Sequence, residues 1–169
     1  MGDISTDLKQ NEKRVREMIE GCDDILFRPM KLGKNKEISC FLIYIEVAAS
    51  NMMLEDSVIG KMLNHMWEMD ESGIQKAIEE NSLGVSDTKE LVSMDEAMAA
   101  MLAGNVVLFV DYFDKAIKIG SKGYPGTGVM KADSEKVLRG SKEAFSESVK
   151  VNTALIRKRV RDTALKVKE

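Results

Sequence analysis

The stretch ISCFLIYIEV, residues 38–47, is the most strand-like run in the chain. It is continuous, apolar and rich in β-branched residues, which is typical of a strand that is covered on both faces. The preceding run DDILFRPMKL, residues 23–32, predicts a second strand, and LGKNKE, residues 32–37, is the turn between them. Pro29 has no backbone N–H, so this second strand is expected at a sheet edge or a bulge.

Helices are predicted before and after this strand pair in the sequence. Leu8, Val15, Ile19 and Cys22 recur at helical spacing after a cap at Ser5 or Thr6. Further helices are expected after Asp56 or Ser57, over 73–82 and over 93–104, the last of them starting at Ser93 or Asp95. A short strand is expected at 89–93. Residues 105–120 predict two strands joined by a tight turn around Tyr112 to Asp114.

The order of these elements predicts an α/β fold. We expect two small α/β lobes with short mixed sheets flanked by helices, followed by a C-terminal helix. The expected domains are an N-terminal lobe over 1–75 and a second lobe with the C-terminal helix over 76–169, with a hinge near 70–90. A Gly-rich loop is expected over 121–135.

Composition limits the possible functions. The net charge of −3 does not suit a general polyanion binder, and no run approaches the ~20 apolar residues of a membrane helix. The N-terminus lacks the apolar core of a signal peptide, so the chain as given is interpreted as soluble and intracellular. Cys22 and Cys40 lie in or beside apolar stretches, which favours buried free thiols over a disulfide.

Residues for catalysis or metal binding are scarce. The single histidine, His65, lies on an amphipathic helical pattern, with no cysteine nearby in sequence to share a metal. The GSKGYPGTG stretch, residues 120–128, lacks the G-K-[ST] ending of a phosphate loop. We therefore predict no enzymatic activity, no catalytic residues, no metal site and no cofactor.

The stretch RGSKEAFSESVKVNTALIRKRVRD, residues 139–162, predicts the last helix. Phe145, Val149, Ile156 and Val160 fall on one face, which is expected to hold the fold, while Arg157 and Arg159 are expected to be exposed. Asn152 falls on the same apolar face. Either the helix breaks or caps locally at Asn152, or its amide bonds another segment or subunit.

The basic cluster RKRVR, residues 157–161, allows three interpretations. It can be a solvated helix end favoured by the helix dipole. It can bind nucleic acid, although no aromatic residue interleaves and the rest of the chain is acidic. It can also be a cytoplasmic polybasic segment beside a membrane.

From Asn105 to Lys168 the chain resembles the A subunit of GerA-type spore germinant receptors. The resemblance lies in NVVLFVDYFDKAIKI, GYPG and residues 134–169, and more loosely in CDDILFR, residues 22–28. The motif positions are Arg139, Gly140, Glu143, Phe145, Asn152 through Arg157, and Arg159. Thr163 and Ala164 stand where the family usually has a proline after the Arg-Asp pair.

The resemblance implies the soluble N-terminal domain of a membrane protein of the spore inner membrane, with this domain facing the spore core. The basic end then flanks a coming membrane region and lies near the membrane surface. Implied partners are the B and C subunits and other A subunits in a homo-oligomer, with no nucleic acid. Arg139, Gly140, Glu143, Asn152, Thr153, Arg157 and Arg159 are the expected binding or interface residues.

Two functions remain open. In the first, the domain assembles with other receptor subunits and relays a nutrient signal that starts germination. In the second, it binds a small nutrient molecule itself, between its two lobes. A ligand-dependent rise in melting temperature distinguishes the second from the first.

Overall fold

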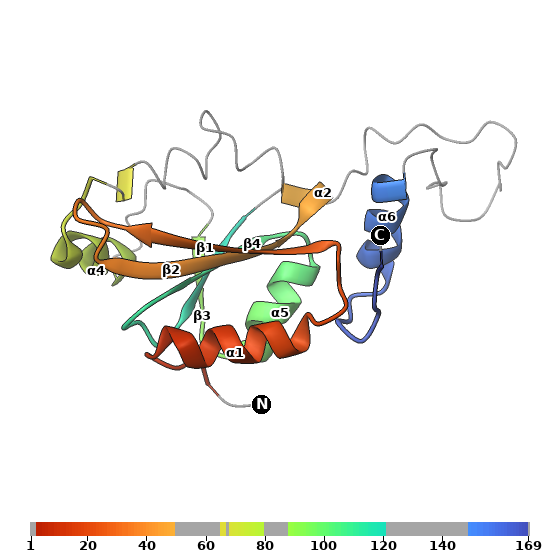
Figure 1. Cartoon of the computed structure of the whole chain (residues 1–169), viewed down its shortest axis with the longest axis horizontal. Coiled ribbons are helices and arrows are strands. Elements are labelled where there is room, and N and C mark those ends of the chain that lie inside the picture. The colour runs from red at the N-terminus through yellow and green to blue at the C-terminus, as the bar shows by residue number, and fades with distance from the viewer. Residues whose placement is uncertain (1–2, 50–64, 67, 80–87, 121–148, 169) are drawn as a thin grey trace, which may run out of the picture.

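The computed structural model describes residues 3–49, 65–66, 68–79, 88–120 and 149–168. Its strands are β1 (Ile25–Leu32), β2 (Ile38–Ile45), β3 (Thr88–Leu91), β4 (Val106–Val110) and β5 (Ala116–Ile119). They form one antiparallel sheet in the order β1-β2-β4-β5-β3, shown in Figure 1. The α/β class is confirmed, but the described strands form neither two lobes nor mixed sheets.

The pairing of β2 with β4 joins the two predicted hairpins into one sheet. Cys40 lies opposite Val110 and Ile43 opposite Val107, with every residue between them in register. Nearly all side chains of both strands are buried, so each strand needs neighbours as well as cover on both faces. Strands from both predicted lobes therefore share this sheet, and the proposed division at residues 75 and 76 stays a prediction.

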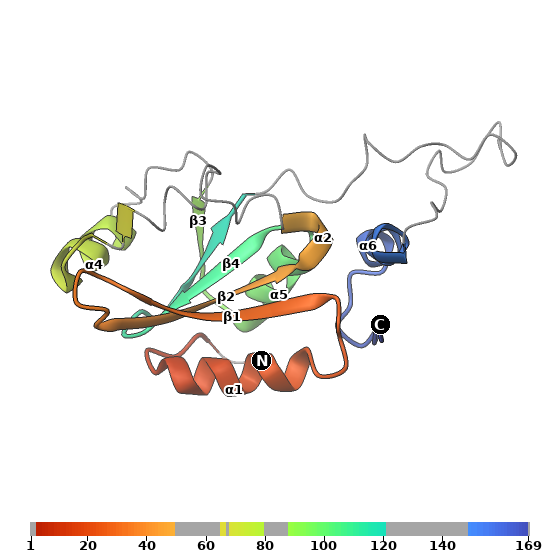
Figure 2. The same cartoon turned by 45° about the horizontal axis from the view of Figure 1, so that its top comes forward.

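Helices cover the two faces of the sheet unequally. α1 (Leu8–Met18) and α5 (Met94–Leu102) pack on one face, where they bury a core that includes Phe41, Val107 and Phe109. α4 (Glu71–Glu79) covers part of the other face through Ile74 and Ala77. Figure 2 shows α1 and α5 on the same side of the sheet.

Aromatic rings strengthen the face beneath α1. The ring of Phe41 stacks between Phe27 and Phe109, with centroid distances of 4.6 and 4.7 Å. The guanidinium of Arg16 on α1 lies 3.9 Å from the centroid of Phe27, in a cation–π contact. This ladder crosses β1, β2 and β4 and thereby holds the edge strand to the centre of the sheet.

Several local predictions are confirmed and one is wrong. β1 is an edge strand of the described sheet, as Pro29 indicated, and Ser93 caps α5 by accepting a hydrogen bond from the Glu96 amide at 3.2 Å. The first helix is capped by Asp7 instead of Ser5 or Thr6, because the Asp7 carboxylate accepts from the Lys9 amide at 3.0 Å. Both cysteines are buried free thiols.

The remaining helices are α2 (Glu46–Ala49) and α6 (Val149–Arg159). α6 lies beside α2 at one end of the sheet, and the chain ends next to it (Figures 1 and 2). The Lys150 ammonium bonds the Glu46 carboxylate at 3.0 Å and links the two helices. Residues 56–64 of the helix predicted after Asp56 or Ser57 lie outside the described residues, as do the Gly-rich loop over 121–135 and Phe145, whereas His65 and Met66 are described and helical.

Candidate functional site

The residues predicted as interface positions gather on α6 as far as the structure describes them. Asn152 and Thr153 are half-buried, Arg157 is fully buried and Arg159 is exposed. The helix continues through Asn152 and Thr153, so the break considered from the sequence does not occur, and Asn152 has an interaction partner. Arg139, Gly140 and Glu143 lie outside the described residues, and their roles stay predictions.

Arg157 makes a buried ion pair with Asp24, the residue directly before β1. Its Nε donates to Asp24 Oδ2 and its Nη2 donates to Asp24 Oδ1, both at 2.8 Å. The two side chains are 0% and 6% exposed. This two-pronged geometry matches the planar guanidinium to the carboxylate and is the strongest form of such a pair.

The third nitrogen of Arg157 organises the segment that follows α6. Nη1 donates to the carbonyl oxygens of Asp162 and Leu165, at 2.8 and 3.0 Å. This segment lies on the turn before β1. There the Asp23 amide donates to the Val167 carbonyl at 2.8 Å, and Cys22 and Val167 form an isolated parallel β-bridge. We call Asp24, Arg157 and residues 162–168 the C-terminal joint.

The electrostatics keep Arg157 charged. Burial by itself lowers the pKa of Arg157. The hydrogen bonds and the negative charge of Asp24 raise that pKa by more, so the net shift is upward. Every polar side-chain atom that is buried among the described residues has a hydrogen-bond partner. The joint is therefore fully satisfied as it stands, and the loss of one member leaves its partners unpaired in a dry site.

The exposed and buried faces of α6 are opposite to those predicted. Ala154, Leu155 and Arg157 are buried, whereas Val149, Ile156 and Val160 are exposed. The prediction that Arg157 is exposed is wrong, because Asp24 supplies a buried partner for its charge. Helical spacing groups residues by face but does not say which face meets the sheet.

Sequence reasoning missed Asp24 and the segment after α6. Asp24 stands in CDDILFR, between an apolar strand and a cysteine, where an acidic side chain needs either solvent or a cation. An acidic residue directly before an apolar strand was therefore the signal that the sequence offered for a buried ion pair. It could not name the partner, because Asp24 and Arg157 are 133 residues apart in the chain.

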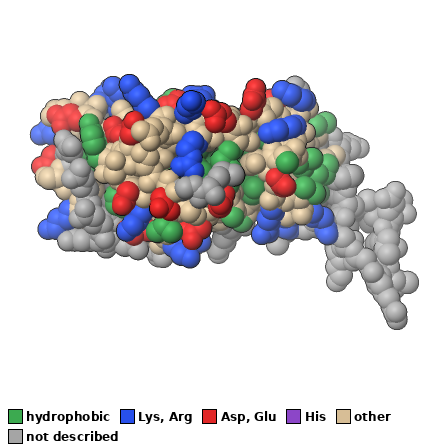
Figure 3. All heavy atoms as spheres, turned by 90° about the horizontal axis from the view of Figure 1, so that it is seen from below, with side chains coloured by type: hydrophobic (Ala, Val, Ile, Leu, Met, Phe, Trp, Pro, Cys, Tyr) green, Lys and Arg blue, Asp and Glu red, His purple; other side chains and the backbone are tan. Residues whose placement is uncertain are grey.

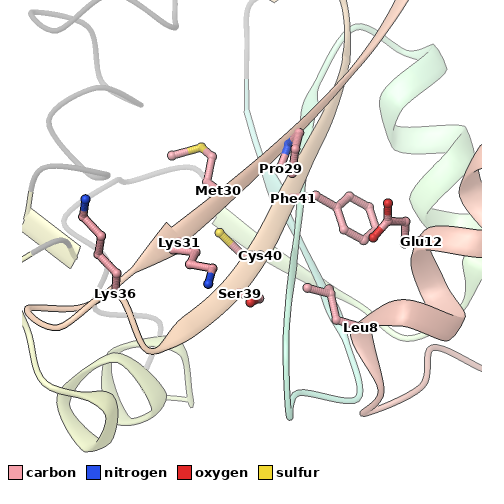
Figure 4. A pocket seen from close by; sticks show the side chains of 9 residues that line it. All are labelled: Leu8, Glu12, Pro29, Met30, Lys31, Lys36, Ser39, Cys40 and Phe41. Atoms are coloured by element: carbon pink, nitrogen blue, oxygen red, sulfur yellow. The ribbon is translucent and has the colours of Figure 1, made fainter.

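An open groove of about 530 Å³ is a second candidate site (Figure 4). It lies between α1 and the β1–β2 hairpin, and its lining includes Leu8, Phe41, Ser39, Lys31 and Glu12. The Glu12 carboxylate already pairs with Arg16 Nε at 2.8 Å. The groove is lined by both apolar and charged side chains, which suit a small amphiphilic molecule, but it does not lie between two lobes.

No group of three or more histidine, cysteine, aspartate or glutamate side chains in the described part of the chain could hold a metal ion. The described helices also include none that is long and apolar enough to cross a membrane.

Comparison with known proteins identifies the family. The pattern of the family described as "Bacillus/Clostridium GerA spore germination protein" matches residues 13–169. The chain is 34% identical over 165 residues to the uncharacterized membrane protein YfkQ of Bacillus subtilis, covering 97% of this chain and 31% of that protein. It is 23% identical over 166 residues to the spore germination protein KA of Bacillus subtilis, covering 98% and 30%.

A solved structure supports the fold. The N-terminal domain of the A subunit of the Bacillus megaterium spore germinant receptor GerK3 superposes with a TM-score of 0.64 at 18% identity, covering 96% of this chain and 58% of that one. The chain spans about a third of the length of the two relatives named above. The match over nearly its whole length places this chain in the GerA family of spore germination proteins.

Proposed function

We propose that this chain is the N-terminal assembly and relay domain of a spore germinant receptor A subunit. In this proposal it assembles with B and C subunits and with other A subunits, and it has no enzymatic role. The full-length protein lies in the spore inner membrane, and this domain faces the spore core. The family match and the membrane relative support this assignment.

The C-terminal joint is the observation that carries the relay. Arg157 holds three parts of the chain together: the start of β1, the helix α6 and the segment after it. A movement of the sheet at Asp24 therefore displaces residues 162–168 directly. Buried, fully paired networks have a small number of discrete arrangements, which makes them suitable for passing a change between distant parts of a protein.

In this proposal, the C-terminal joint lies where the domain connects to the membrane region of the receptor. The relatives are about three times as long as this chain, and we propose that a membrane region follows the basic segment. A rigid attachment at this point transmits force from the domain to that region, whereas a loose attachment does not. The relay proposal therefore requires the Arg157–Asp24 pair to be intact in the working receptor.

The test is germination of spores that carry Arg157→Lys in the full-length subunit, with Arg159→Lys as the matched control. Lysine keeps the charge but loses the planar fork, so the change loosens the joint without burying an unpaired carboxylate. We expect slower nutrient germination for Arg157→Lys only, at equal subunit abundance on an immunoblot. Unchanged germination with a measurably loosened joint contradicts the relay.

The groove beside α1 supports direct nutrient binding as the second candidate. Its apolar and charged lining side chains suit a small amphiphilic molecule. It ranks second because Lys31 and Lys36 are exposed and Glu12 is paired with Arg16. A rise in melting temperature with amino acids or sugars, lost in Lys31→Glu but not in Lys34→Glu, which changes an exposed lysine outside the groove lining, would support it.

A further inference from the structure

Exposed aliphatic side chains are concentrated on the outer face of α6. Five large hydrophobic side chains are exposed in the described part of the chain, and three of them lie on α6 or directly after it. These are Val149, Ile156 and Val160, with 69%, 42% and 45% of their surfaces accessible. Val160 continues the helical turn, because its amide donates to the Ile156 carbonyl at 2.8 Å. The three side chains therefore form one stripe.

The same end of the molecule is strongly basic. Residues 149–168 contain seven lysines and arginines and a single acidic residue, Asp162, although the whole chain has a net charge of −3. Arg157 and Lys150 pair with Asp24 and Glu46. Arg159, Arg161 and Lys168 have exposed side chains. Figure 3 shows hydrophobic and basic side chains together at the end of the molecule formed by α6 and the segment after it.

The ordinary explanation covers only half of this pattern. Basic residues are favourable at a helix C-terminus, because they complement the helix dipole. That explanation gives no reason for an exposed aliphatic stripe on the same helix. A stable protein–protein interface needs about 800 Å² on each partner, and three half-exposed side chains supply only a fraction of that area. A lipid surface needs no complementary shape and attracts both kinds of side chain.

We propose that the outer face of α6 is a membrane-contact surface for anionic phospholipid. Val149, Ile156 and Val160 enter the boundary between headgroups and acyl chains, and Arg159 and Arg161 bind the headgroup phosphates. This contact sets the orientation of the domain on the membrane. It specifies the membrane partner of the proposed receptor domain, and it rests on that function only for its biological setting, since lipid binding is a property of this chain alone.

Vesicle flotation of the purified 169-residue chain tests the proposal. The vesicles are pure phosphatidylcholine or a mixture with about a third phosphatidylglycerol, at low and at physiological salt. One variant is Ile156→Ser with Val160→Ser, and a second is Arg159→Gln with Arg161→Gln. The controls are Val92→Ser, which changes an exposed aliphatic residue elsewhere, and Arg28→Gln with Lys34→Gln, which removes two exposed charges from the β1–β2 hairpin.

We expect the wild-type chain to float with the anionic vesicles only, and more weakly as salt rises. Each arginine removed should lower the partition coefficient about fivefold, since a basic residue near an anionic surface contributes about a factor of five. The serine variant should bind several-fold more weakly than the wild type, and the control variants should bind as strongly as the wild type. All variants should keep the wild-type melting temperature.

Three results overturn the proposal. The first is no flotation with anionic vesicles at low salt. The second is loss of binding in the arginine variant with wild-type binding in the serine variant, which indicates unspecific charge attraction. The third is a wild-type dimer that becomes monomeric in the serine variant without any change in lipid binding, which identifies the stripe as a protein interface. None of these results bears on the Arg157 germination test.

Discussion

Replacing Arg157 by methionine should destabilise the chain far more than the same change at Arg159. Methionine fills a similar volume but cannot donate a hydrogen bond. At position 157 it leaves the buried Asp24 carboxylate without its two bonds of 2.8 Å, and it removes the bonds to the Asp162 and Leu165 carbonyls. At position 159 the side chain is exposed.

The magnitude follows from burial. Breaking a buried ion pair by removing one partner costs about 3–5 kcal/mol, because the remaining charge stays in a dry site. Arg157 is 0% exposed and the Asp24 side chain 6%, so the full range applies. The exposed Arg159→Met change should cost about 0.5 kcal/mol or less. Asp24→Leu alone should cost as much as Arg157→Met, whereas the double variant should cost less than the sum of the two.

Urea denaturation of the purified variants measures these differences, with coincident transitions by two probes as the check for two-state unfolding. Hydrogen exchange at the Asp23 amide, which donates to the Val167 carbonyl, reports local detachment of the C-terminal segment. A detached segment on an otherwise folded sheet would appear as lost protection at Asp23 with unchanged protection in β2 and β4.

Two results would refute this reasoning. One is an Arg157→Met cost within about 0.5 kcal/mol of the Arg159→Met cost, with Asp23 still protected. The other is strict additivity of Asp24→Leu and Arg157→Met, since residues in one network couple by about 0.5–3 kcal/mol. Either outcome means that the pair does not hold the joint together.

Three further predictions concern packing and titration. Leu155→Ala should cost about 2–4 kcal/mol and Ile156→Ala less than about 1 kcal/mol in urea denaturation, because Leu155 is buried and Ile156 is exposed; equal costs would mean that the helix faces are assigned wrongly. Phe41→Ala should cost about 3–5 kcal/mol because it removes the central ring of the aromatic ladder, and a loss below about 1 kcal/mol would contradict that packing. Burial raises the pKa of the Cys40 thiol from 9.0 to about 12. The thiol therefore favours the folded state below pH 9, and this contribution is lost as pH rises through 9 to 12, by about 1.4 kcal/mol between pH 8 and pH 10. The Cys40→Ala variant should lose correspondingly less stability over that interval. If the unfolding free energies of variant and wild type fall equally between pH 8 and pH 10, the raised pKa of Cys40 is contradicted.

Local elements were predictable because their signals are local. Most of the apolar run at 38–47 becomes the interior strand β2, Pro29 lies in an edge strand, and Ser93 caps α5. In each case a short stretch of sequence meets its structural requirement within a few residues. The resemblance to the germinant receptor A subunit was also readable, because its motif is a continuous run.

The arrangement of the hairpins was not predictable to the same degree. Two strand pairs separated by about 60 residues could form two small sheets or one larger sheet. The choice depends on whether β2 and β4 pair, and that pairing is long-range. Both strands are apolar on both faces, which is compatible with either arrangement.

The sequence by itself determined the α/β class, most strand and helix positions, the buried thiols and the family. Only the tertiary structure decided that the described strands form one sheet, that Arg157 is buried and that the aliphatic side of α6 faces outward. The physical reason is that a helical repeat fixes which residues share a face, whereas the neighbouring segment fixes which face is buried. Here that neighbour is Asp24, whose charge makes the burial of an arginine favourable.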